Sequence, residues 1–247
     1  MPIAHTMGRR EGTRVVQTQT PYQTHTPSSG MITPTGDSGE GSPDIAAPRS
    51  GRPAVATVPV TDLDNGSLVL RLSFTINHLS RWLSPIHDPA PLLRATRRGE
   101  PSVMGLLLEM RDEERRVFPK LHQISVQTNP DLDRLPPFAL TATELAHDRQ
   151  RIPLEVMAEF RRLRQSTCSL LRSLVDAAWE RPGTSRQGHN WTIRTLAEHL
   201  AAHDLTLLAD MDTTLDRSGA REGIAAISRV PLAEMLTLVP VRTRHGR

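Results

Sequence analysis

The sequence contains a single cysteine, Cys168, so it cannot form an internal disulfide or a cysteine-rich zinc site. Cys168 lies in an apolar helical pattern, QSTCSLLRSL, which indicates a buried small residue rather than a nucleophile. No run approaches the roughly 18 consecutive apolar residues of a membrane span, and MPIAHTMGRREGTRVV lacks the apolar core of a secretory signal. We therefore expect a cytoplasmic protein with no membrane partner.

Aromatic residues are also scarce, at 3% of the chain, and Lys120 is the only lysine. The isoelectric point of about 9.9 suggests a nucleic-acid partner at first sight. However, the net charge of +3 arises in residues 217–247, which contain six arginines and two glutamates, while the centre of the chain is near neutral. A nucleic-acid groove reader needs a basic face with aromatic stacking partners. We expect a small-molecule substrate and no nucleic acid.

The two ends of the chain differ in composition from its centre. Residues 1–62 are rich in Thr, Ser, Pro and Gly and offer no aliphatic cluster, so they cannot offset the entropy of ordering. We predict a disordered leader there. Residues 217–247 are predicted to form a loose basic tail. Their amphipathic piece, residues 223–241, is interrupted by Pro231 and Pro240. It is expected either to dock against the rest of the chain or to remain a loose tail.

Residues 63–216 show helical periodicity. Apolar residues recur at spacings of three and four in four segments, at about 66–84, 102–124, 153–179 and 192–215. Ser102 is a candidate N-cap, and Pro119 predicts a kink or a weakened last turn. We interpret the stretch between the second and third segments as a long loop. Because no period-2 alternation and no repeats occur, an all-α antiparallel four-helix bundle is predicted.

His199 and His203 are the most informative residues of the chain. They stand four apart in TLAEHLAAHD, so they share one face of the predicted fourth helix with Leu196 and Leu200. Two parallel imidazoles inside a bundle can bind a divalent metal if a third protein ligand joins them. The alternative is a pair of core-edge histidines bonded to neighbours or water. HLAAH lacks a glutamate after its first histidine, which excludes the HExxH metalloprotease mechanism.

Three phrases resemble those of the DinB-like superfamily, a group of metal-binding four-helix bundles. They are LLLEMRDEE in the second segment, WERPG before the last, and TIRTLAEHLAAHD within it. The resemblance covers about residues 66–216, and the order and separation of the phrases carry it. It implies a DinB-like bundle and, by analogy, a homodimer. In that family three histidines bind one divalent ion, one from the second helix and two from the fourth.

The resemblance also implies a ligand set. His199 and His203 match the pair on the fourth helix, and Glu109 stands where the first histidine is expected. Glutamate can replace it, since zinc accepts His₂Glu and iron or manganese accepts two histidines with one carboxylate. The implied metal site is Glu109, His199 and His203, with Glu113 in reserve and Zn, Mn, Fe or Ni as the ion. Alternatively, Glu109 is a solvated side chain that marks a decayed site.

The resemblance implies a metal-dependent transferase or isomerase that uses a low-molecular-weight thiol as co-substrate, because a bound metal promotes loss of the thiol proton. The alternative is a non-catalytic DinB-like module for stress response, binding or dimerisation, with a structural or decayed metal site. Asp204, directly after His203, is either an acceptor for an imidazole N–H or a solvated residue. The sequence indicates no separate catalytic residue.

Overall fold

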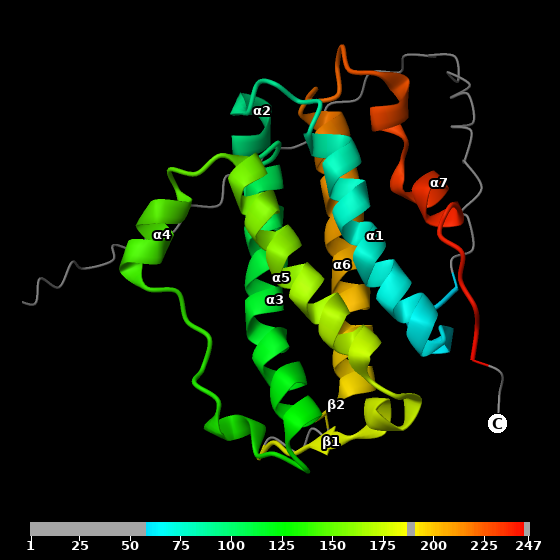
Figure 1. Ribbon diagram of the computed structural model, residues 1–247. Helices are drawn as coiled ribbons and strands as arrows, with labels where there is room; N and C mark the ends of the chain where they lie inside the picture. Colours follow the sequence, from blue (N-terminus) through cyan, green and yellow to red (C-terminus); the bar gives the residue numbers. More distant parts are fainter. Residues whose placement is uncertain (1–57, 187–190, 245–247) are drawn as a thin grey trace, which may run out of the picture. The chain divides into compact units, whose positions relative to one another are not determined.

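The computed structural model describes residues 58–186 and 191–244, and most of the predicted leader therefore lies outside the described residues. Within them, four long helices form a bundle (Figure 1). These helices are α1 (Asn65–Leu83), α3 (Val103–Val126), α5 (Pro153–Ser173) and α6 (Ile193–Arg217). The predicted all-α four-helix bundle is confirmed. No helix in the described part of the chain is long and apolar enough to cross a membrane.

Short elements lie between the long helices and at the two ends of the bundle. They are α2 (Ala90–Leu93), α4 (Ala142–Asp148), α7 (Leu232–Thr237), the strands β1 (Pro182–Gly183) and β2 (Trp191–Thr192), and 3-10 turns at Val60–Asp62, Leu132–Arg134, Asp176–Glu180 and Ala226–Arg229. The two strands are antiparallel, with Pro182 opposite Thr192. Helix α4 corrects the expected long loop. Its Thr141 and Glu144 form a reciprocal capping box, which satisfies N–H groups that a short helix otherwise leaves unpaired.

Side-chain caps mark the starts of α1, α3 and α6, whereas α5 begins at Pro153 without one. Ser102 accepts a hydrogen bond from the Gly105 N–H at the start of α3, as the sequence predicts. Thr192 caps α6 in a reciprocal arrangement with Thr195. Pro119 does not end α3, which continues to Val126. The local signals therefore place the helix starts correctly.

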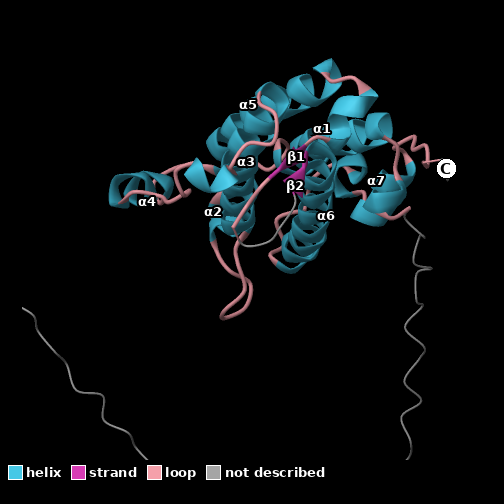
Figure 2. Ribbon diagram, turned by 90° about the horizontal axis from the view of Figure 1, so that it is seen from below, coloured by secondary structure: helices cyan, strands magenta, loops and turns pink. Residues whose placement is uncertain are grey.

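The helices do not simply alternate in direction. In Figure 1, α1 runs up, α3 and α5 run down, and α6 runs up. Helix α3 packs against α5 and α6, and α1 packs against the same two helices. Figure 2 accordingly shows α1 and α3 at opposite corners of the bundle. The α3–α6 and α1–α5 contacts are antiparallel and the other two are parallel. The long segment with α4 returns the chain so that α5 can run parallel to α3.

A buried polar layer divides the core into two hydrophobic clusters. One cluster includes Trp82 and Phe160, and the other includes Trp179 and Cys168. Cys168 is buried, as predicted, and burial raises the pKa of its thiol.

Arg164 stands at the centre of this polar layer and is fully buried. Its Nε donates to Glu114 over 2.8 Å, and its Nη2 donates to Asp204 over 3.0 Å. Thr75 also donates to Asp204, over 2.7 Å. Asp204 is therefore neither solvated nor bonded to an imidazole, which corrects both sequence interpretations. Because buried charges need partners, the layer holds α3, α5 and α6 in one register.

The C-terminal segment packs against the bundle. The Trp82 indole donates to the carbonyl of Val230 over 2.9 Å, and the Leu232 N–H donates to Asp212 over 2.8 Å. Met235 and Leu236 of α7 are buried. The prediction of a loose tail is thus wrong for residues 217–244, and docking is correct for the amphipathic piece. The physical reason is that its apolar side chains cover Trp82, which would otherwise meet water.

Candidate metal site

The predicted ligands lie on two facing helices. Glu109 and Glu113 are one turn apart on α3, and His199 and His203 are one turn apart on α6. Because the two helices are antiparallel, Glu109 lies opposite the later histidine, His203, and Glu113 lies opposite the earlier one, His199. Nε2 of His199 lies 2.8 Å from Oε1 of Glu113, and Nε2 of His203 lies 3.7 Å from Oε1 of Glu109. The two imidazoles stack with ring centroids 6.1 Å apart. Both Nε2 atoms therefore face carboxylates of α3.

The two pairs differ in burial. The Glu113 side chain is 8% exposed and its partner His199 is 42% exposed, whereas Glu109 is 53% and His203 20% exposed. Arg116, one turn further along α3, forms an ion pair with the second oxygen of Glu113. Glu113 is thus held from two sides. In the described part of the chain, Glu109 forms no ion pair closer than the 3.7 Å contact with His203, and its half-exposed carboxylate can turn toward solvent or toward the histidines.

Both imidazoles favour the neutral form. Burial lowers the pKa of His199, and the positive charges of Lys120 and Arg116 lower it further. Burial also lowers the pKa of His203, against the opposing effect of Asp204 and Glu109. A neutral His199 with its proton on Nε2 can donate to Glu113, which agrees with the short contact. Nδ1 of His203 is buried and has no hydrogen-bond partner among the residues that the structure describes.

Among residues 58–186 and 191–244, no three His, Cys, Asp or Glu side chains converge into a group that could hold a metal ion. The predicted ligands, Glu109, His199 and His203, are instead divided between the two pairs. The donor chemistry nevertheless fits a divalent ion, because two carboxylates face two neutral imidazoles across adjacent helices. Convergence requires Glu109 to rotate and the Glu113–His199 hydrogen bond to open. The ligand set remains a prediction.

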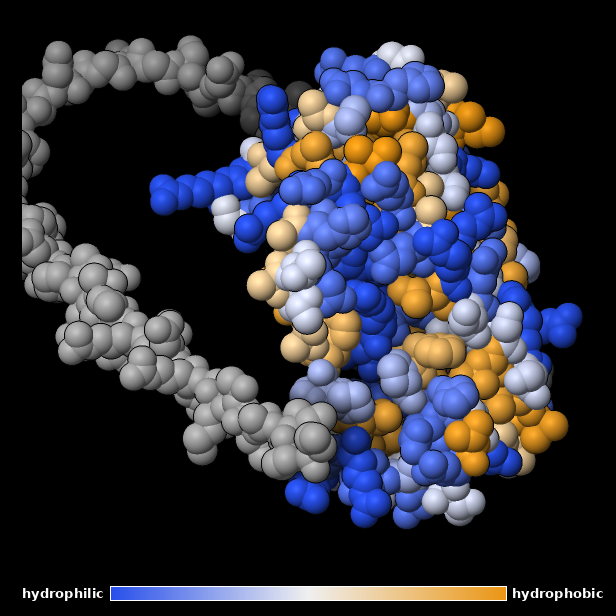
Figure 3. All heavy atoms as spheres, turned by 60° about the vertical axis from the view of Figure 1, so that its left-hand side comes forward, coloured by the Kyte–Doolittle hydropathy of each residue, from blue (hydrophilic) through white to orange (hydrophobic). Residues whose placement is uncertain are grey.

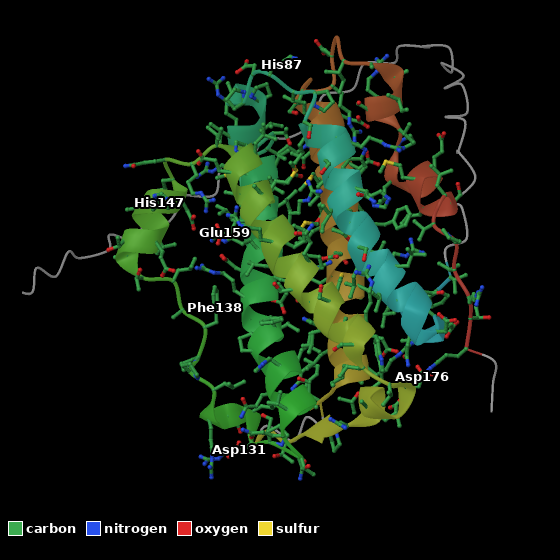
Figure 4. All side chains as sticks on the ribbon, in the orientation of Figure 1. His87, Asp131, Phe138, His147, Glu159 and Asp176 are labelled. Atoms are coloured by element: carbon green, nitrogen blue, oxygen red, sulfur yellow. The ribbon has the colours of Figure 1, made fainter. Side chains whose placement is uncertain are left out.

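Residues 127–152, which connect α3 to α5 and include α4, form a crossing segment. Two cavities lie beside the pairs on the side of this segment, which is turned forward in Figure 3. One has a volume of about 690 Å³ and is lined by Glu109, Leu108 and Leu145, among others. The second has a volume of about 930 Å³ and includes Phe138, which Figure 4 places on the crossing segment beside α3. Arg116 lines both cavities. The candidate site therefore borders two spaces that small molecules can enter.

Sequence reasoning missed three residues of this region. Arg116 and Lys120 continue the face of Glu109 and Glu113, at positions i+7 and i+11 from Glu109. Helical spacing could have found them, because these positions point in nearly the same direction. Trp191 lies edge-on to His199, with ring centroids 6.2 Å apart. No local pattern indicates this contact, since it depends on the β1–β2 pairing before α6.

The comparisons with known proteins include a structural match to a four-helix bundle. No family model and no curated protein matches the sequence. Among solved structures, YfiT from Bacillus subtilis, described as a probable metal-dependent hydrolase with an unusual four-helix bundle topology, matches with a TM-score of 0.51 and 16% sequence identity. The match covers 65% of this chain and 89% of YfiT. This likeness agrees with the bundle that the DinB-like resemblance implied, and it shows that the chain has the four-helix-bundle fold of YfiT.

Proposed function

We propose that this chain binds one divalent metal ion between α3 and α6 and acts as a metal-dependent transferase or isomerase with a low-molecular-weight thiol. The observation that carries the proposal is the facing of two carboxylates and two neutral imidazoles across adjacent helices. The DinB-like resemblance contributes the thiol chemistry. The description of YfiT as a probable metal-dependent hydrolase supports a metal in a bundle of this fold.

Each residue has a role in the proposal. His199 and His203 would hold the ion through Nε2, together with the exposed carboxylate of Glu109. Glu113 would be available as a fourth ligand if its hydrogen bond to His199 opened. When bound, such an ion supplies Lewis acidity, which lowers the pKa of a thiol and makes it a nucleophile at neutral pH. Arg116, released from Glu113, can hold an anionic group of the substrate.

The two cavities support a reaction with two substrates. Their volumes of about 690 and 930 Å³ are within the range of roughly 300–1,000 Å³ that is usual for small-molecule sites. Since Arg116 lines both, molecules in the two cavities approach each other beside the metal ligands. A thiol and an electrophile could therefore be brought together there, as a transferase requires.

The second candidate function is a non-catalytic DinB-like module with a decayed site. One observation favours it: Glu113 already pairs with both His199 and Arg116, so its charge is neutralised with no metal ion. In this alternative Glu109 is a solvated carboxylate, and the pairs serve to join α3 and α6. The protein then works through binding or dimerisation.

Metal analysis distinguishes the two candidates. Full-length protein is reconstituted separately with Zn²⁺, Mn²⁺, Fe²⁺ and Ni²⁺, desalted, and assayed for metal per chain. We expect about one equivalent of at least one metal, since a single set of ligands is present. His199→Ala and His203→Ala should abolish binding, and Glu109→Ala should weaken it strongly.

The matched control is His147→Ala, which removes an exposed histidine of α4 (Figure 4) and should leave the metal content unchanged. Less than about a tenth of an equivalent in the unaltered protein with all four metals would contradict the metal-dependent proposal. It would favour the decayed-site alternative, in which Glu109→Ala changes neither metal content nor thermal stability.

A further inference from the structure

The cavity of about 930 Å³ contains one cation that has no ion-pair partner in the described part of the chain. Its charged lining residues are Arg115, Arg116, Lys120, Asp133 and Glu144. Four of these are engaged. Arg115 pairs with Glu144 over 3.3 Å, Arg116 pairs with Glu113, and Asp133 accepts from the Arg186 N–H. Within residues 58–186 and 191–244, Lys120 has no carboxylate within 4.0 Å, although its charge acts on that of Asp133 at longer range. Its Nζ lies 5.7 Å from the centroid of the Trp191 ring.

The same cavity gathers the few aromatic residues of the chain. Of four Phe, three Trp and one Tyr, three line it, namely Phe118, Phe138 and Trp191. The Arg116 guanidinium lies 5.3 Å from the Phe138 ring centroid. Pro136 and Pro137 add rigid apolar surface. Aromatic and guanidinium planes favour a flat ligand, because they stack against its faces.

The cavity and the candidate metal site share one face of helix α3. Glu109, Glu113, Arg116 and Lys120 form one face of α3, which is acidic toward the start of the helix and basic toward its end. Trp191 connects the basic part to the histidines through its edge-on contact with His199. The cavity is therefore linked to the candidate metal site through Arg116 and Trp191.

We propose that this cavity binds a small aromatic carboxylate, with Lys120 holding the carboxylate and Phe138 and Trp191 flanking the ring. The inference rests on the proposed function in one respect, that the bound acid is the substrate class of the metal site. The binding itself needs no metal. An ammonium group is a compact charge that suits a carboxylate, and the aromatic walls exclude water from the apolar part of the ligand.

The test is isothermal titration calorimetry on full-length, metal-free protein with 2-naphthoate as the probe. The neutral analogue 2-naphthylmethanol and the ringless anion acetate serve as matched ligands. We expect saturable binding of naphthoate, and affinities for the alcohol and for acetate that are each lower by at least about tenfold, because each lacks one of the two interactions. Lys120→Met should lower naphthoate affinity by about tenfold and leave the alcohol unaffected.

Two control variants test whether the effect depends on the charge at position 120 and on the cavity. Lys120→Arg retains the positive charge and should retain most of the naphthoate affinity. Arg134→Met removes an exposed cation of the neighbouring 3-10 turn that does not line the cavity, and it should change nothing. Circular dichroism confirms that each variant is folded. If Lys120→Met does not fold, the comparison of naphthoate with the alcohol in the unaltered protein decides the matter.

The proposal is overturned if naphthoate shows no saturable binding, if the alcohol binds equally well, or if folded Lys120→Met binds naphthoate within twofold of the unaltered protein. Metal content is measured on the same samples. Loss of metal with naphthoate binding retained counts against the proposed function alone. About one equivalent of metal without naphthoate binding counts against the aromatic-acid site alone.

Discussion

Substituting Arg164 tests how much the buried polar layer contributes to the stability of the bundle. The Arg164 side chain is fully buried and bonds Glu114, Asp204 and the carbonyl of Leu72. Arg164→Met keeps much of the apolar stem but leaves two buried carboxylates without a cation. Breaking a buried pair from one side costs about 3–5 kcal/mol, because the remaining charge stays desolvated. Since domains are stable by about 5–15 kcal/mol, the variant should lose a large fraction of its stability.

The assay is urea unfolding at pH 7 followed by circular dichroism and by tryptophan fluorescence, which reports on the buried Trp82 and Trp179. Arg162→Met is the matched control, since it removes an exposed arginine from the same helix and should change the free energy of unfolding by less than about 0.5 kcal/mol.

A triple variant separates charge burial from lost packing. Arg164→Met combined with Glu114→Gln and Asp204→Asn removes every charge of the layer, so it should recover at least half of the lost stability. A loss below about 1 kcal/mol for Arg164→Met alone would refute the reasoning. Failure of the triple variant to recover would show that the guanidinium acts through packing instead.

Two further predictions concern pH and a close backbone contact. Burial, followed by Arg71 and Arg81, lowers the pKa of His78 to about 4, against the opposing effect of Asp204. As the pH falls, His78 is therefore protonated in the unfolded chain before it is protonated in the folded protein, and the free energy of unfolding decreases from pH 6.5 down to pH 4. His78→Gln should make the free energy of unfolding, measured with urea, less dependent on pH in this range. Gly183→Ala places a Cβ within 3.0 Å of the buried Ile124 and Leu132 side chains, so the melting temperature should fall by several degrees. Gly66→Ala is the control, because its Cβ would lie at ordinary contact distance, 3.7 Å from Oδ1 of Asp64, and should not lower the melting temperature by this mechanism.

The candidate site shows where sequence reasoning reaches its limit. The spacing of His199 and His203 is enough to place both on one face of one helix. Glu113 was identified only as a reserve carboxylate. Its pairing with His199 depends on the antiparallel register of α3 and α6, which brings residues 86 positions apart to within 2.8 Å. Helical spacing carries no information about which turn of a second helix stands opposite.

The fold divides in the same way. Periodicity and caps such as Ser102 determined the long helices, because these signals act between residues three or four apart. The capping box of Thr141 and Glu144 was also present in the sequence, although α4 was expected to be a loop. Docking of residues 217–244 was not decidable locally, since it depends on Trp82 lying exposed at the surface of the bundle until that segment covers it.

The sequence by itself therefore determined four amphipathic helices, one buried cysteine and a pair of imidazoles on one face. The tertiary structure decided which side chains those imidazoles meet. It also decided that Asp204 belongs to a buried layer with Arg164, and that the basic end of α3 borders an aromatic cavity. The physical reason is that helix formation depends on neighbours along the chain. Pairing across helices depends instead on how buried charges such as Arg164 and Glu114 find partners in the folded core.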